Sequence, residues 1–115
     1  MTAEDIRAIS KKLPHTTEDV KWGADLCFCV AAKMYCVTGL SGPFGVSFKV
    51  PDEDFEEVST RKGFKPADYV ARYKWVTVTE ASAISRKELE SFIRTSYELV
   101  SAKLPKKLRR ELGLV

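Results

Sequence analysis

The longest amphipathic stretch of the chain runs from Ser85 to Leu104 and predicts one long helix. Ser85 and Glu88 have capping-box spacing, which satisfies backbone N–H groups at a helix start. Side chains that recur at helical spacing then form one face, namely Leu89, Phe92, Ile93, Ser96, Val100 and Leu104. Burying each large apolar side chain contributes about 1.5–3 kcal/mol. The rest of the chain must therefore supply an apolar surface on which this helix packs.

The residues before this helix predict a mixture of helices and strands. A first helix begins near Thr2 and stops before Pro14, because the residue before a proline avoids the helical region. A short helix is expected from Pro51 to Gly63, where glycine suits the left-handed stop. Alternating apolar and polar side chains predict strands at residues 26–30, 33–38, 46–50, 69–71 and 74–79.

The expected element order is α-β-β-β-α-β-β-α, which is typical of an α+β fold rather than of alternating βα units. We expect one domain over residues 1–115, with a single antiparallel sheet of about five strands and the long C-terminal helix packed on one sheet face. Residues 15–25 are expected to form a connection, with Trp22 as a lid over one end of the core. A solvent-facing Trp22 that binds a ligand is the alternative.

Composition indicates an ordinary globular chain of 115 residues, with 44% hydrophobic and 30% charged residues. The sequence contains no apolar run of the roughly 20 residues that a membrane helix needs. The first residues also lack the apolar core of a signal peptide. These features predict a cytoplasmic monomer that does not associate with membranes.

The sequence contains few residues of the types that commonly catalyse reactions or bind metals. Three cysteines (Cys27, Cys29 and Cys36) and a single histidine (His15) show no zinc-ligand spacing, so buried thiols are the favoured interpretation over a metal or redox site. The acidic run at residues 52–57 suits the positive N-terminal end of a short helix. We therefore expect no enzyme activity, no cofactor and no metal.

Basic residues suggest a surface for nucleic acid. The net charge is +3, and Lys and Arg occur on the predicted strand ends and in the C-terminal tail. Phosphate contacts need such side chains on one surface. The candidates are Lys49, Arg72, Lys74, Lys103, Lys106, Lys107, Arg109 and Arg110. Tyr73 and Trp75 are expected to share a strand face, where one could stack on a base, although Trp75 is favoured as a core residue.

A set of short motifs adds a resemblance. These are Trp22, Lys33-Met34-Tyr35, Lys49, Pro66, the Trp75-Val-Thr-Val strand, Ser96-Tyr97 and Lys103-Leu-Pro105. In their order and spacing, from about Ile6 to Arg110, the chain resembles the MmcQ/YjbR-like family of small bacterial proteins. Lys74 stands where many members have histidine, which counts against a histidine-dependent site.

The resemblance implies an α-β(3)-α-β(2)-α domain of CyaY-like or secretion-chaperone-like shape, and DNA binding through two hairpin wings (a double wing). DNA is therefore the leading expected partner, with weak, salt-sensitive binding. The alternative is a protein-interaction or chaperone-like module without catalytic activity, in which an uncovered face of the sheet would bind another protein.

Overall fold

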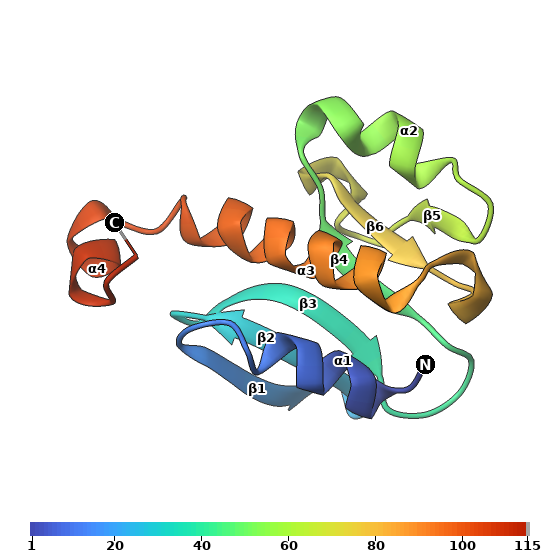
Figure 1. The fold of residues 1–115 in the computed structure, drawn as a ribbon, viewed down its shortest axis with the longest axis horizontal. Helices are drawn as coiled ribbons and strands as arrows, with labels where there is room; N and C mark the ends of the chain where they lie inside the picture. Colours follow the sequence, from blue (N-terminus) through green and yellow to red (C-terminus); the bar gives the residue numbers. More distant parts are fainter. Residues whose placement is uncertain (115) are drawn as a thin grey trace.

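In the computed structural model, which describes residues 1–114, six antiparallel strands form one sheet with helices on one of its faces (Figure 1). The strands are β1 (Thr16–Lys21), β2 (Asp25–Val30), β3 (Lys33–Gly39), β4 (Val46–Lys49), β5 (Phe64–Pro66) and β6 (Trp75–Val78), in the spatial order β1-β2-β3-β4-β6-β5. The helices are α1 (Ala3–Ser10), α2 (Phe55–Ser59), α3 (Arg86–Ser101) and α4 (Lys106–Glu111), with short 3-10 turns η1 (Asp52–Asp54), η2 (Ala71–Tyr73) and η3 (Ala81–Ala83).

The predicted α+β class, with a single antiparallel sheet and a long C-terminal helix packed on one face, is confirmed. The strand count is six rather than about five, because β1 occupies part of the stretch expected to be a connection. This edge strand is mostly exposed, and its sequence Thr-Thr-Glu-Asp-Val-Lys has no apolar alternation to reveal it. Charged side chains are typical of sheet edges, where they discourage pairing with other chains.

The strand expected at residues 69–71 is wrong. The fifth strand instead spans Phe64–Pro66 and pairs with β6 at the other edge of the sheet. Pro66 is tolerated there because an edge strand has one set of backbone groups without a ladder partner. Tyr69 has a φ of +67°, which takes it out of the extended region, and η2 follows at once.

Helix α3 begins with one half of the predicted capping box, because the Ser85 hydroxyl accepts a hydrogen bond from the Glu88 N–H at 3.1 Å. The Glu88 carboxylate, however, accepts two hydrogen bonds of 3.0 Å from Arg61. The helix ends at Ser101 rather than Leu104, because Pro105 disfavours helical geometry in the residue before it. Leu104 nevertheless remains buried.

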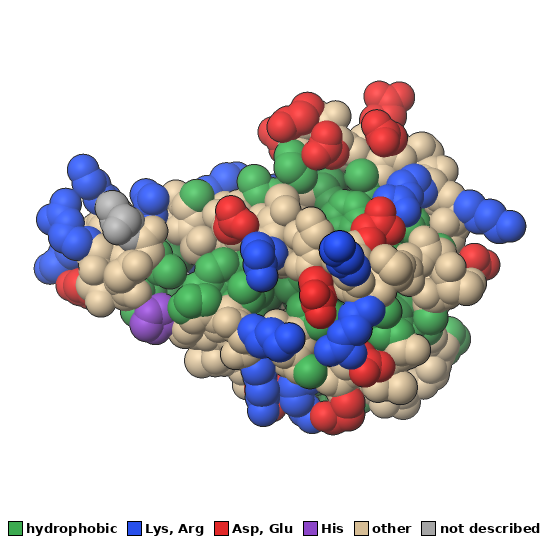
Figure 2. All heavy atoms as spheres, in the orientation of Figure 1, with side chains coloured by type: hydrophobic (Ala, Val, Ile, Leu, Met, Phe, Trp, Pro, Cys, Tyr) green, Lys and Arg blue, Asp and Glu red, His purple; other side chains and the backbone are tan. Residues whose placement is uncertain are grey.

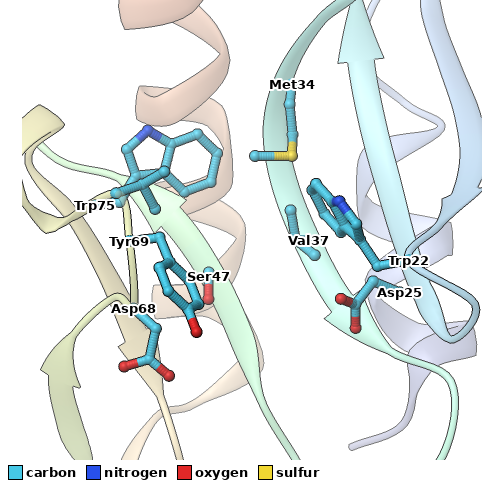
Figure 3. A pocket seen from close by; sticks show the side chains of 9 residues that line it. Trp22, Asp25, Met34, Val37, Ser47, Asp68, Tyr69 and Trp75 are labelled. Carbon is cyan, nitrogen blue, oxygen red and sulfur yellow. The ribbon is translucent and has the colours of Figure 1, made fainter.

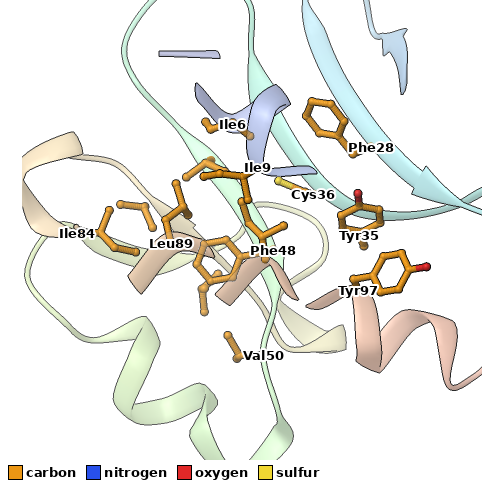
Figure 4. Close-up of a cluster of buried hydrophobic side chains, with 14 of the residues drawn as sticks. Ile6, Ile9, Phe28, Tyr35, Cys36, Phe48, Val50, Ile84, Leu89 and Tyr97 are labelled. Carbon is orange, nitrogen blue, oxygen red and sulfur yellow. The ribbon is translucent and has the colours of Figure 1, made fainter. Parts of the chain in front are cut away.

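The core lies between the sheet and helices α1 and α3 (Figure 4). Ile6 and Ile9 from α1 meet Leu89 and Ile93 from α3 over the inward residues of the sheet. The inward row across the central strands is Phe28, Cys36, Phe48 and Val76, which are paired in register. Tyr97 also contributes, with its ring edge-on to Tyr35 at 5.2 Å and its hydroxyl donating to the Pro14 carbonyl at 2.6 Å.

A buried hydroxyl group separates two central strands. Strands β3 and β4 pair from Thr38↔Val46 to Cys36↔Phe48, and the next rung would join Tyr35 to Lys49. At that rung Ser96 of α3 accepts a hydrogen bond from the Lys49 N–H at 2.9 Å and donates one to the Tyr35 carbonyl at 2.6 Å. Ser96 is fully buried. Its hydroxyl therefore takes the place of a direct backbone hydrogen bond, and the two strands diverge beyond it.

We predict that Ser96→Ala lowers the free energy of unfolding by about 2–3 kcal/mol, because it leaves a buried N–H and a buried carbonyl without partners. Urea denaturation followed by circular dichroism would measure this change. Ser91→Ala makes the same chemical change at an exposed position of α3 and should stay within about 0.5 kcal/mol of the parent protein. Equal stability of the two variants would contradict the bridging role of Ser96.

Candidate functional site

Three lysines gather where β3, β4 and α3 separate. Lys33 at the start of β3, Lys49 at the end of β4 and Lys103 after α3 line a hollow of about 290 Å³, together with Val100, Leu104 and Pro105. We call this hollow, with its six lining residues, the lysine hollow. Of its three lysines, Lys49 and Lys103 are predicted site residues, whereas Lys33 was not predicted. Within residues 1–114, none of the three has a carboxylate at salt-bridge distance.

The surroundings of Lys49 disfavour its charged form. Partial burial lowers the pKa of Lys49 from its ordinary value, the positive charges of Lys103 and Lys74 lower it further, and Asp52 opposes them. The Lys49 ammonium group donates a hydrogen bond to the Tyr73 carbonyl, which fixes its position. The positive charges of Lys49, Lys74 and Lys103 repel one another. An anion bound among them would offset this repulsion, and the three charges would stabilise the anion.

Arg72 and Lys74 belong to the connection between β5 and β6, and the charge of Lys74 acts on Lys49 of the hollow. The Arg72 guanidinium carbon is 4.8 Å from the centre of the Tyr73 ring, and the Lys74 ammonium is 5.1 Å from that of Phe55. Tyr73 was expected to share a strand face with Trp75, and this is wrong. Tyr73 belongs to η2 and is about half exposed, whereas Trp75 begins β6 and is only 6% exposed. Trp75 is thus buried as predicted, but it lies on the outer face of the sheet and not in the cluster between the sheet and the helices.

The remaining predicted residues form a separate group. Lys106, Lys107, Arg109 and Arg110 belong to α4, which begins directly after Pro105 of the lysine hollow. Figure 2 shows Lys and Arg side chains at the α4 end of the molecule and acidic side chains over α2 at another. The His15 side chain lies 2.7 Å from the Leu112 carbonyl and ties α4 to the loop before β1.

A larger cleft, which sequence reasoning did not locate, lies on the sheet face away from α3. Val37, Ser47 and Thr77 are paired across β3, β4 and β6, one position from the inward row, so they share the outer face. The cleft there has a volume of about 590 Å³. In Figure 3, Trp22, Met34 and Val37 lie on one side of it, and Tyr69 and Trp75 lie on the other. We call it the sheet cleft.

Two aromatic side chains stand at the rim of the sheet cleft. Trp22 is 73% exposed and Tyr69 is 98% exposed. The prediction that Trp22 covers the core is therefore wrong, because its side chain faces solvent. Both residues have left-handed backbone, with φ of +51° and +67°. Bulky residues rarely adopt this conformation, and it costs roughly 1–2 kcal/mol per residue.

The charges in the sheet cleft are opposite to those of the lysine hollow. Asp25 and Asp68 line the cleft, and none of its described lining residues is Lys or Arg. Lys65 lies 3.5 Å from Asp68, but both side chains are substantially exposed, so solvent weakens this pairing. The two hollows are neighbours, because Lys33 precedes Met34 on β3 and Lys49 pairs with Trp75 across β4 and β6.

Comparison with known proteins decides the family. A family model described as YjbR matches residues 11–99. The chain belongs to the YjbR family. The crystal structure of a Deinococcus radiodurans protein with a DUF419 domain is similar to this YjbR protein at 32% identity and a TM-score of 0.89, covering 99% of this chain and 89% of that one. A Pseudomonas syringae protein shares the fold at 22% identity and a TM-score of 0.73, covering 87% of this chain and 99% of that one. No curated protein matches the chain.

The cysteines of this YjbR protein are all buried, as predicted. Burial raises the pKa of the Cys36 thiol well above its ordinary value, and it also raises the pKa values of Cys27 and Cys29. Over residues 1–114, no three His, Cys, Asp or Glu side chains converge in a way that could hold a metal ion. None of the described helices is long and apolar enough to cross a bilayer.

Substitution of the two tryptophans should change the free energy of unfolding by very different amounts. Trp22→Asn should leave the free energy of unfolding within about 0.5 kcal/mol of the parent value or raise it, because Trp22 is exposed and asparagine tolerates left-handed backbone. Trp75→Ala should lower it by about 3–5 kcal/mol by emptying a buried site. Urea denaturation would measure both. A large loss of stability in Trp22→Asn would show that Trp22 has a structural role.

Proposed function

We propose that this YjbR-family protein binds nucleic acid, with DNA as the leading ligand, through the lysine hollow and the basic residues next to it. The observation that carries this proposal is the convergence of Lys33, Lys49 and Lys103 from three separate elements. Ammonium groups on one surface are what a phosphate backbone requires. The role is binding rather than catalysis.

The hairpins support a double-wing arrangement. Lys33 follows the β2–β3 turn, where Ala31 and Ala32 have left-handed backbone. Arg72 and Lys74 occupy the connection between β5 and β6. Each hairpin thus contributes a lysine to the hollow or close to it, Lys33 from one and Lys74 from the other. Helix α4 follows Pro105 and adds Lys106, Lys107, Arg109 and Arg110.

The expected binding is weak, salt-sensitive and largely independent of sequence. Lysine is a point charge on a flexible chain, suited to phosphate contact rather than to bidentate recognition of a base. Trp75 is buried and cannot stack on a base without rearrangement. Affinity should therefore come mainly from release of counterions, which makes it depend steeply on salt concentration.

We predict that replacing Lys33, Lys49, Lys74 and Lys103 with Gln together lowers DNA affinity about tenfold or more at low salt. The slope of log affinity against log salt should fall by about 0.9 for each duplex phosphate that the variant no longer neutralises. Fluorescence anisotropy of labelled single- and double-stranded DNA at several salt concentrations would measure both effects. A parallel variant with Lys106, Lys107, Arg109 and Arg110 replaced by Gln would measure the contribution of α4.

The matched control removes four exposed lysines elsewhere, namely Lys11, Lys12, Lys62 and Lys87, and changes the net charge equally. It should keep most of the affinity and the salt slope of the parent protein. If the control weakens binding as much as the lysine-hollow variant, the effect comes from net charge alone and the surface assignment is wrong. Absence of DNA binding by the parent protein at low salt would remove the proposal.

A substitution of Lys49 alone should weaken DNA binding without lowering the stability of the protein. Its pKa is lowered in the folded state, so protonated Lys49 opposes folding at neutral pH, and this penalty is relieved only as pH rises through that lowered pKa. Lys49→Met should therefore keep or raise the thermal midpoint while it weakens DNA binding. The substitution should also make stability less dependent on pH at alkaline pH, as thermal denaturation across this range would show. Loss of both stability and binding would contradict this separation.

A second candidate function, protein interaction, is favoured by a different observation. The outer sheet face is not covered by α3, and it contains an apolar cleft with exposed aromatic residues and two carboxylates. Such a surface is typical of a site that binds another protein. Carboxylates would repel a phosphate backbone, so this cleft is poorly suited to DNA.

A further inference from the structure

We propose that the sheet cleft binds a cationic peptide segment of a partner protein. One large apolar side chain of the segment lies between Trp22 and Tyr69, and lysine or arginine residues beside it face Asp25 and Asp68. This inference deepens the second candidate function and is independent of DNA binding at the lysine hollow.

The size and lining of the cleft indicate an apolar anchor. Its volume of about 590 Å³ is within the range of ligand pockets, which are mostly apolar with a few polar groups. Met34, Val37, Val70 and Trp75 supply an apolar lining between the two rim aromatics. Aromatic rings stack edge-on or offset against one another, so a phenylalanine side chain is a suitable occupant.

Trp22 and Tyr69 at the rim are exposed, and both have a backbone conformation that is unfavourable for bulky residues. Both Trp22 and Tyr69 adopt left-handed backbone, which glycine or asparagine would adopt more readily. Neither ring is buried enough to offset this cost through packing in the isolated chain. Covering the rings with a partner would bury apolar surface that is now in water. The strain is thus explained if the rings serve as contacts for a ligand.

Charge complementarity selects the partner. Asp25 and Asp68 are on opposite sides of the cleft in Figure 3, so basic residues on both sides of one apolar residue could each face a carboxylate. Lys65 lies 3.5 Å from Asp68, and Lys21 is opposite Asp25 in the β1–β2 register, so each carboxylate has one lysine neighbour. Neither lysine lines the cleft, so the charged groups that a ligand inside it meets are the two carboxylates. An acidic peptide or a phosphate backbone would instead meet two negative charges.

The test uses the full chain and the peptide acetyl-Lys-Lys-Phe-Lys-Lys-amide as the probe. Tryptophan emission reports binding directly, because Trp22 is exposed while Trp75 is already buried. We expect a blue shift of the emission as the peptide is added. Trp22→Asn and Tyr69→Asn should each weaken binding about threefold to tenfold, measured by calorimetry where the tryptophan signal is lost.

Matched controls isolate each part of the proposal. The peptide with Phe replaced by Ser tests the apolar anchor, and acetyl-Glu-Glu-Phe-Glu-Glu-amide tests the charge; both should bind at least tenfold more weakly. Asp25→Asn with Asp68→Asn should reduce affinity for the lysine peptide and flatten its salt dependence. The four-lysine variant of the lysine hollow should bind the peptide as tightly as the parent protein, so failure of DNA binding leaves this test intact.

Several outcomes would overturn the proposal. No binding of the lysine peptide at millimolar concentration, equal binding of the acidic peptide, or unchanged affinity in the Trp22→Asn, Tyr69→Asn double variant would each reject it. A blue shift that grows with protein concentration alone, together with a rise in molecular mass on sedimentation, would identify a second copy of this chain as the occupant. Loss of DNA binding in the double variant would instead assign the cleft to nucleic acid.

Discussion

The hydrogen bonds of Ser96 determine how the sheet opens. A side-chain hydroxyl between the Lys49 N–H and the Tyr35 carbonyl satisfies both groups while holding the strands further apart than a direct hydrogen bond would. Buried backbone groups are almost always paired, so the strands can diverge here only because α3 supplies this substitute. Beyond it, β4 continues along β6, as the hydrogen bond from the Val50 N–H to the Lys74 carbonyl shows. Ser96 thus allows the sheet to separate into two parts at this point. Strands β3 and β4 therefore supply residues to both hollows.

The two hollows differ in chemistry although the same strands build them. Lys33 and Met34 are consecutive residues of β3, yet the first lines the lysine hollow and the second lines the sheet cleft. Lys49 and Trp75 are likewise opposite one another in the ladder and contribute to different hollows. Because the end of α3 limits one hollow and the hairpin residues Trp22 and Tyr69 border the other, a small domain presents a basic surface beside an acidic, aromatic one.

Sequence patterns predicted the parts of this fold that have strong local signals. The long amphipathic helix and strands β2, β3 and β4 follow from periodicity, and they are present. The burial of the three cysteines follows from the usual burial of free thiols, and it is observed as well. Strand β1 was not predicted because its polar side chains face solvent, so burial leaves no trace in its sequence. Lys49 and Lys103 were predicted as site residues from their charge, but Lys33 and the sheet cleft depend on register and strand divergence, which no local pattern encodes. Trp22 was placed wrongly because tryptophan is normally buried, whereas here it lies in the β1–β2 turn with a left-handed backbone and an exposed side chain.

The neighbouring charges also bear on specificity, which is a difference between affinities for right and wrong partners. A basic segment entering the sheet cleft at the end next to Lys49 would be repelled, so the proposed segment would enter at the other end, which Asp25 and Asp68 border from opposite sides. A nucleic acid bound at the lysine hollow would be repelled if it continued into the sheet cleft, because its phosphates would face the carboxylates of Asp25 and Asp68. These interactions act over about 8–10 Å at physiological salt, the range within which exposed charges still influence each other. The two proposed sites would therefore take separate ligands of opposite charge, and one ligand spanning both would meet repulsion at one of them.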